Sequence, residues 1–585
     1  MHRKKRLATA GVCVLTVLAV LLALASTGHA AAPLAGNLPG KPLIYVGWGG
    51  APAHWKGYRK SRFRVFLAKS RLSEFFTRDL PEIIRHVAAR NRPKARQMAE
   101  NLIYSNMFYQ HPFAFYVSNF QLNSRDGNLP PVGLHIELVM RAGKDAPTIL
   151  AAFRNWAHQL NRHGLNPPPP ALHVMTGKVG NNIYLAAGLT PQMLALLSAS
   201  AAAIAPGSLQ NDPAFQAVIA RTRPDSALQL YANVHAMVAL VNEGMARQPH
   251  VTAKIRKIEQ DVEKDIHLDS YTDFAMGSGF SGRRWMQSVY LGETRSHAAP
   301  RRQAAVKSLL QMVPLQCADF SITTVDLRAL TNSIFQVAAA AGHARELHQT
   351  LAMAQAFTGL DIRHGLLNTF GPNWLVYQSP YIPLAGVNGM IMVNQLRHPR
   401  RFAQTLVTLT PLMLVGANAA YRKTHPGAKP LHLLHTRVGT QTIYYLQTPT
   451  LLPAWCIADN KFYFALYPRT IQLAFEHQAD KTSIANSAKF QDVLRRLGNV
   501  SGIQGVGYAD DPALVPAGYM GTLLISKLVP LLTGMRLHPP LTSLLPTLGD
   551  LEDILTPSGS ITWTDSTGFH SRNISAFPGG SLLTP

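Results

Sequence analysis

The feature that most restricts how this chain can fold is a set of short blocks that occurs twice in the same order. LHVMTGKVGNNIYLA begins at Leu172, and LHLLHTRVGTQTIYYL begins at Leu431. SLQNDPAFQAVIARTR begins at Ser208, and SIANSAKFQDVLRRLG begins at Ser483. The triplets YAN at position 231 and YAD at position 508 continue the series. Matched blocks in one order predict two copies of a folding unit.

The two predicted repeats span residues 38–300 and 301–585, and each is long enough to bury a core. The second carries an insertion, WCIADNKFYFALYP (455–468), which has the pattern of a β-hairpin turning at Asp459 and Asn460. Elsewhere β-rich runs such as PFAFYVSN alternate with helical runs such as APTILAAFRNWAHQLNRHG. The strands are closely spaced and joined by short turns. We therefore expect an α+β fold, with mainly antiparallel sheets covered by helices on one face.

The first thirty residues predict export. HRKKR (2–6) is followed by a run without charge from Leu7 to Ala25, and then by small residues. This is the layout of a secretory signal peptide, and we expect cleavage after Ala30, with Ala25 as the alternative site. An uncleaved anchor is the alternative, because about twenty apolar residues are needed to cross a bilayer. The expected location is periplasmic or secreted, with a tether to the inner membrane if the segment is retained.

No second membrane span is expected. The apolar run LVTLTPLMLVGANAA (406–420) is interrupted by Pro411, which breaks helices in water. Cys317 and Cys456 are the only cysteines after the predicted signal segment. In an oxidising compartment they would either pair or remain as two buried thiols, and their spacing does not decide between these states.

Several of these features together resemble a known group. A signal segment, two diverged copies, the VG..IY strand and the S[LI].N...FQ.V helix resemble an uncharacterised family of exported bacterial proteins, known only as a domain of unknown function. The resemblance covers nearly all of the chain after the signal segment. It implies a location outside the cytoplasm, and it implies no catalytic residue.

Motifs for catalysis, metal binding or nucleotide binding are absent or have a structural interpretation. GSGFSG (277–282) fits the dinucleotide pattern GxGxxG, but RRWMQSVYLGE follows it and alternates as a strand does, so we expect a glycine-rich hairpin. His432 and His435 would point to opposite faces of a strand. KIRKIEQDVEKDIHLD (254–269) has the pattern of a solvated helix face. We expect no catalytic residue, no metal and no cofactor, and we leave enzymatic activity open.

One segment is strongly basic. WKGYRKSRFRVFLAKSR (55–71) interleaves aromatic and basic residues, within a chain of net charge +25. Phe63, Phe66 and Leu67 fit one face of a helix that would cover the sheet and continue to Phe75. An anionic contact surface is the alternative role. Its candidate residues are Lys56, Arg59, Lys60, Arg62, Arg64, Lys69 and Arg71.

The sequence favours an exported, non-catalytic protein of the cell envelope, acting as a scaffold or binding protein for an anionic or amphipathic partner. Its expected partner is an anionic envelope polymer or a membrane surface, without specific nucleic-acid recognition. The sequence also permits two alternatives. One is a hydrolase outside the cytoplasm with its site between the repeats, and the other is a lipid-binding carrier.

Overall fold

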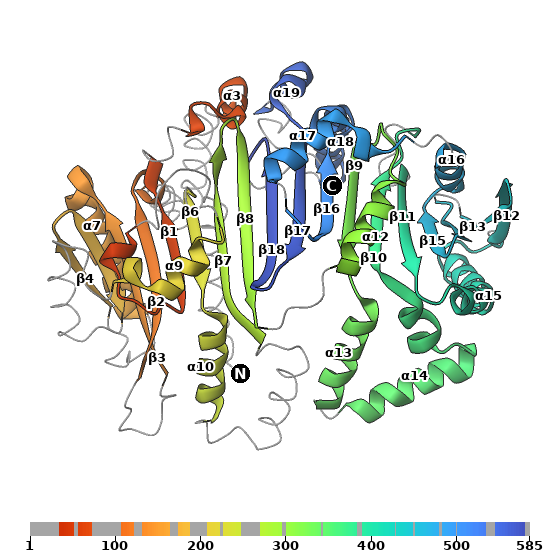
Figure 1. Ribbon diagram of the computed structural model, residues 1–585, viewed down its shortest axis with the longest axis horizontal. Coiled ribbons are helices and arrows are strands. Elements are labelled where there is room, and N and C mark those ends of the chain that lie inside the picture. Colours follow the sequence, from red (N-terminus) through yellow and green to blue (C-terminus); the bar gives the residue numbers. More distant parts are fainter. Residues whose placement is uncertain are drawn as a thin grey trace.

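The computed structural model describes residues 34–51, 57–72, 107–121, 132–163, 174–187, 208–222, 226–246, 270–294, 300–340, 343–382, 389–427, 429–448, 451–478, 482–498, 500–533 and 544–578. Within these residues, eighteen strands form one sheet whose neighbouring strands are all antiparallel, and helices pack around it (Figure 1). The predicted α+β class and antiparallel sheet are confirmed. The predicted signal segment (1–30) and the run at 254–269 lie outside the described residues.

The first half of the sheet runs in the order β4-β5-β3-β2-β1-β6-β7-β8. Its strands are β1 (Ile44–Trp48), β2 (Phe113–Gln121), β3 (Val132–Arg141), β4 (Val174–Val179), β5 (Asn182–Ala187), β6 (Leu228–Ala232), β7 (Tyr271–Ser281) and β8 (Arg284–Glu293). The GSGFSG segment ends β7 and turns directly into β8, which confirms the glycine-rich hairpin.

The second half runs in the order β12-β13-β14-β15-β11-β10-β9-β16-β17-β18. Its strands are β9 (Asp319–Thr324), β10 (Phe370–Gln378), β11 (Met390–Leu396), β12 (His432–Val438), β13 (Gln441–Gln447), β14 (Ala454–Ala458), β15 (Lys461–Ala465), β16 (Ile503–Ala509), β17 (Ser558–Thr564) and β18 (Gly568–Ser575). This order matches that of the first half, with the hairpin β14-β15 added. The predicted hairpin is thus confirmed, and Asp459 and Asn460 take the left-handed φ values, 49° and 60°, that its tight turn requires.

The two halves meet as neighbouring strands, because β8 pairs with β18. In the first half, Tyr231 of β6 pairs with Ala275 of β7, which pairs with Tyr290 of β8. In the second half, Tyr508 of β16 pairs with Gly559 of β17, which pairs with Ile574 of β18. Tyr290 and Ile574 are therefore equivalent positions. Across the junction, Tyr290 pairs with His570, which is four residues before Ile574. Ile574 pairs with Met286, which is four residues before Tyr290. The junction therefore has approximate local twofold symmetry.

Two clusters of three aromatic rings occupy corresponding places in the halves. Phe215 of α9 (Pro213–Ile219) packs edge-on against Tyr45 and Tyr231, with ring centroids 5.2 Å away in both contacts. Phe490 of α17 (Ala488–Leu497) packs against Phe320 and Tyr508 at 5.4 Å in both. Both helices come from the second pair of matched sequence blocks, so the shared residues of those blocks build core.

Helices cover both faces of the sheet, which corrects the expectation of one covered face. In β1, Tyr45 packs toward α9, whereas its neighbour Val46 belongs to the core under α7 (Ala146–His163). In β15, Tyr463 belongs to the core with α12 (Pro300–Leu310), α16 (Pro468–Gln478) and α17, whereas Phe462 and Phe464 belong to the core with α15 (Pro399–Thr424). Because adjacent residues of a strand point to opposite faces, each half is buried on both sides.

The structure corrects the expectation about Pro411 and decides between the two states left open for the cysteines. The helix α15 runs through Pro411, although a break was expected there. A proline removes one hydrogen bond of a helix, and α15 is held on either side of it: buried Phe402 packs under its first turns, and Asn418 exchanges two hydrogen bonds with the backbone of Leu431. Cys317 and Cys456 are free thiols, and both are buried in the same core.

Candidate functional site

The basic segment forms the helix α3 (Arg62–Lys69) at one end of the sheet. Ser61 caps its first turn by accepting a hydrogen bond from the backbone N–H of Arg64 at 3.1 Å. Phe66 is 5% exposed, and its ring lies 4.8 Å from the ring of Phe577. Phe66 is thus a core residue and Phe63 packs against the same core, as the structural interpretation predicted, while Trp55 lies outside the described residues.

The position of α3 differs from the expectation. It does not cover the sheet; it packs against α19 (Leu548–Ile554) and the chain that follows β18. The helix α3 ends at Lys69 with Ser70 as its C-cap, and the predicted continuation to Phe75 reaches residues outside the described ranges. The first-half basic segment therefore packs on elements of the second half.

The candidate cations of this segment have different environments. Lys56 lies outside the described residues. Arg62 is partly buried, and its guanidinium donates hydrogen bonds to the backbone carbonyls of Asp553 and Ile554. Burial, and then the nearby charge of Arg283, lower the pKa of Arg62. Lys69 pairs with Asp550 at 3.0 Å. The exposed candidates are Arg59, Lys60, Arg64, Lys69 and Arg71.

Sequence reasoning missed four arginines that lie at the same end. Arg283 and Arg284 form the turn and the start of β8, and the backbone N–H of Arg62 donates to the carbonyl of Arg283 at 3.1 Å. Arg495 and Arg496 end α17, whose C-terminal carbonyls favour positive charge. The two Arg-Arg pairs are far from α3 and from each other in the sequence. Only the pairing of the strands brings both pairs to the end of the sheet where α3 lies.

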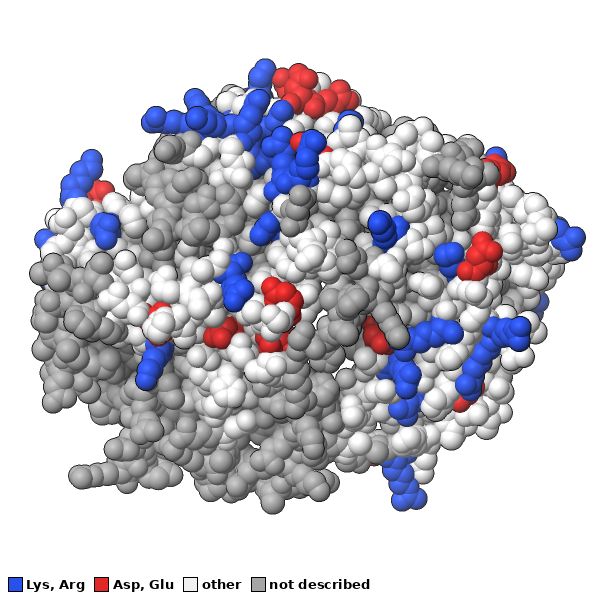
Figure 2. Space-filling model, in the orientation of Figure 1, with Lys and Arg blue, Asp and Glu red and all other residues white. Residues whose placement is uncertain are grey.

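We call the exposed cations gathered here the basic surface: Arg59, Lys60, Arg64, Arg283, Arg495 and Arg496. Figure 2 shows this positive charge beside α3 and α17, with the acidic residues of α19 at its margin. Within the cluster, Asp492 lies 2.8 Å from Arg496, 3.3 Å from Arg495 and 3.5 Å from Arg284. These arginines hold the pKa of Asp492 below its usual value, with the hydrogen bond from Arg496 as the largest cause. One ionised carboxylate thus faces three guanidinium groups, and positive charge remains in excess.

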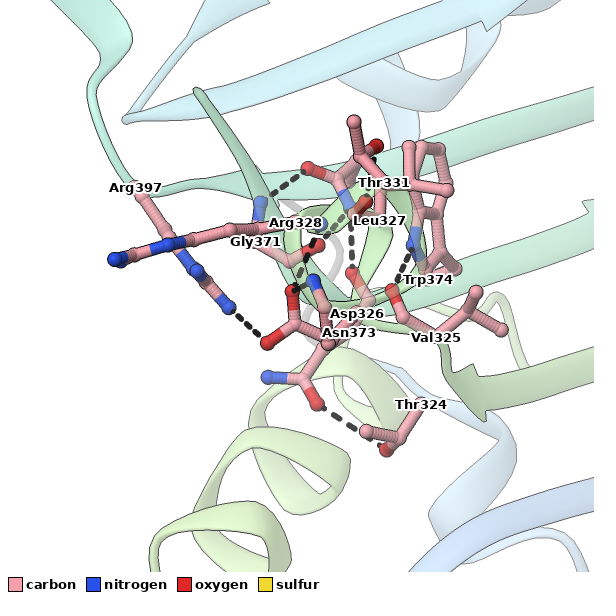
Figure 3. A network of polar contacts seen from close by, with 12 residues as sticks. Thr324, Val325, Asp326, Leu327, Arg328, Thr331, Gly371, Asn373, Trp374 and Arg397 are labelled. Atoms are coloured by element: carbon pink, nitrogen blue, oxygen red, sulfur yellow. Dashed lines mark hydrogen bonds and ion pairs between the residues drawn. The ribbon is translucent and has the colours of Figure 1, made fainter. Parts of the chain in front are cut away.

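A second polar cluster surrounds a bulge in β10 (Figure 3). Asn394 is fully buried, and its side chain accepts a hydrogen bond from the Gly371 N–H and donates to the carbonyls of Gly371 and Asn373. Arg397 lies beside this bulge and pairs with Asp326 at 2.6 Å, while Asp326 also caps α13 (Leu327–Ala340). The side chains of this cluster form hydrogen bonds with backbone groups where the strand is irregular and where α13 begins. These contacts indicate a structural role.

An open cavity of about 660 Å³ adjoins the bulge, between α12 and the ends of β10 and β11. Its lining mixes apolar residues, Ala304, Ala305, Pro372 and Leu396, with the polar residues Ser308, Asn373, Gln395 and Arg397. The positive charge of Arg397 is already paired with Asp326. This cavity is neither the continuous apolar cavity that a lipid carrier requires nor a site of free positive charge.

The hydrolase alternative requires convergent catalytic groups where the halves meet. There, His570 Nε2 lies 3.0 Å from Asp565 Oδ2, and the imidazole stacks on Trp563 with the rings 4° from parallel. Burial lowers the pKa of His570. Among the described residues no serine or cysteine makes a hydrogen bond to this histidine, and no group of three or more His, Cys, Asp or Glu side chains is placed to hold a metal. These surroundings are those of a histidine packed in the core.

Comparisons with known proteins assign no relative. No protein-family model, no curated protein and no solved structure matches this chain.

Proposed function

We propose that this chain is an exported, non-catalytic binding protein of the cell envelope that holds an anionic partner on the basic surface. The observation that carries the proposal is the convergence of exposed cations from three separate segments: the α3 segment, the β7-β8 turn and the end of α17. Like charges repel, so gathering them in a fold has a cost that a bound polyanion offsets. The excess of basic over acidic residues in the whole chain, +25, favours the same class of partner.

We further infer that the two halves are copies of one ancestral unit. The matched strand order, the two aromatic clusters and the matched sequence blocks support this inference. The basic surface takes cations from both halves, since α3 and the β7-β8 turn belong to the first and α17 to the second. On this view duplication created a junction, and the junction carries the binding surface.

Export is part of the proposal and rests on the sequence. The cationic start, the charge-free run from Leu7 to Ala25 and the small residues that follow support a secretory signal. The resemblance to exported bacterial proteins of unknown function favours the same location. A periplasmic or secreted protein with an excess of positive charge would meet anionic polymers and membrane surfaces of the envelope.

The test uses a soluble polyanion, dextran sulfate, so that membrane contact makes no contribution. We expect the wild-type chain to bind it with an affinity that falls steeply as salt is added. A variant carrying Lys60→Ser, Arg283→Ser, Arg495→Ser and Arg496→Ser should bind roughly tenfold or more weakly, with a shallower salt dependence, because fewer counterions are released.

A matched control variant distinguishes binding at the basic surface from a general effect of removing four positive charges. Arg400, Arg401, Arg422 and Lys423 are four exposed cations at the ends of α15, and their replacement by glutamine removes the same charge elsewhere. The control variant should bind dextran sulfate almost as the wild type does. Equal losses in the two variants, or no binding by the wild type, would contradict the proposal.

A further inference from the structure

The helix α15 is long, apolar and mostly outside the core. An eighteen-residue window within Pro399–Thr424 has a mean hydropathy of 1.3, and only 11% of that window is buried. By length and composition alone, this helix could cross a membrane. No acidic residue lies anywhere in α15, and no charged residue lies between Arg401 and Arg422.

Contacts near both ends of α15 fix it to the fold. Phe402 is 1% exposed, with its ring 4.9 Å from that of Phe370 and 5.0 Å from that of Phe462. The Thr405 hydroxyl donates to the carbonyl of Gly365 at 2.8 Å. Near the other end, Asn418 bonds both backbone groups of Leu431. The helix is therefore held against the sheet at both ends, and crossing a bilayer would break these contacts.

Four large apolar side chains of α15 are exposed to solvent. Val407 is 76% exposed, Val415 68%, Met413 51% and Leu412 36%. At 100° per residue, Val407, Leu412 and Val415 fall within an arc of about 140° of the helix, whereas Met413 lies on another side. Single exposed apolar residues are ordinary, but an apolar strip along one side of a helix is typical of a contact surface. Pro411 lies among them and is also exposed.

Basic residues stand at both ends of this strip. Arg400 and Arg401 precede it, and Arg422 and Lys423 follow it, all four exposed. The charge-free stretch is about 30 Å long at the rise of an α-helix. Long basic side chains reach from such a stretch to lipid phosphates while the apolar residues enter the acyl region. This pattern is complementary to an anionic bilayer surface.

We propose that α15 docks flat on an anionic phospholipid bilayer, with Val407, Leu412 and Val415 in the interface and the four terminal cations on headgroup phosphates. The inference goes beyond the proposed function and does not rest on it. It uses a different surface, a different helix and a different kind of contact from the basic surface.

The test measures lipid contact at single positions of the full-length chain, because the apolar N-terminal run would by itself bring the protein to vesicles. In a Cys13→Ser background, Val415→Cys carries a nitroxide label on the outer side of α15. Met520→Cys, on α18 (Asp511–Thr533), is the matched control, since Met520 is 55% exposed. Cys317 and Cys456 are buried and remain unlabelled under native conditions. Collisions with oxygen report lipid, and collisions with a water-soluble nickel complex report solvent.

On phosphatidylcholine vesicles containing phosphatidylglycerol, we expect the label at 415 to favour oxygen and the label at 520 to favour nickel. Replacing Arg400, Arg401, Arg422 and Lys423 by glutamine should reduce the lipid-contacting fraction at 415 roughly tenfold or more. Replacing Lys60, Arg283, Arg495 and Arg496 by serine should leave that fraction unchanged, even if it abolishes polyanion binding. A label at 415 that stays as accessible to nickel as the control overturns the proposal. Equal lipid entry on pure phosphatidylcholine overturns the choice of an anionic surface.

Discussion

The buried side chain of Asn394 gives the sharpest prediction about stability. Its three hydrogen bonds, of 3.0 to 3.1 Å, satisfy the backbone where β10 leaves the regular ladder. In Asn394→Leu, the N–H of Gly371 and the carbonyls of Gly371 and Asn373 lose these partners in a buried site. Each unsatisfied buried group costs about 1–3 kcal/mol, so the free energy of unfolding should fall by at least about 3 kcal/mol.

The variant Asn394→Asp adds a pH dependence with a defined sign. Its carboxylate would keep the bond from the Gly371 N–H but would face two carbonyl oxygens, and burial would also favour the neutral acid. The pKa of this aspartate would thus be higher in the folded state than in the unfolded chain. The loss of stability should be smallest below the pKa of this aspartate in the unfolded chain, near pH 4. It should grow as the pH rises toward the pKa of this aspartate in the folded state.

Urea unfolding followed by tryptophan fluorescence, at a series of pH values, measures both effects. Asn486→Asp, at an exposed position, is the control for adding one carboxylate and should unfold almost as the wild type does. If Asn394→Asp matched this control at neutral pH, or if its deficit did not change with pH, the assigned role of Asn394 would be wrong.

Three further predictions follow from the core. Phe215→Ala and Phe490→Ala should each lower the free energy of unfolding by about 3–5 kcal/mol, because each ring is central to an aromatic cluster; a neutral effect in either half, measured by urea unfolding, would contradict equivalent packing. Burial lowers the folded-state pKa of His570, so wild-type stability should fall below about pH 6.5, and His570→Phe should remove part of that fall in acid-titrated unfolding. Burial raises the pKa of the Cys317 thiol to about 12 and that of Cys456 to about 11, so both should react with a disulfide reagent only after unfolding; fast reaction of the native protein would contradict their burial.

Local features of this fold were predictable from the sequence because they depend on neighbouring residues. Asp459-Asn460 between two β-rich runs predicted a hairpin, and the structure has one there. The alternation after GSGFSG predicted a strand in place of a nucleotide-binding helix, and β8 is that strand. The expected break at Pro411 was wrong, because contacts on both sides of the proline hold α15 together.

The candidate site was only partly predictable. The spacing of Phe66 and its neighbours indicated a helix with a buried aromatic side, but not that this side would meet Phe577 near the other end of the chain. The sequence also gave no sign that Arg283 and Arg496 belong beside α3. Neither residue lies in a dense basic run, and no local pattern connects them.

The sequence by itself determined the strand and helix pattern, the matched blocks and the residues that fill the aromatic clusters, because side-chain periodicity and turn chemistry act over a few residues. Only the tertiary structure decided where charge and exposed apolar surface accumulate. Pairing β8 with β18 joins segments far apart in the chain, which brings cations of both halves to one end. Packing one side of α15 on the sheet leaves its other apolar side exposed. Both outcomes depend on long-range contacts, which a local sequence pattern does not encode.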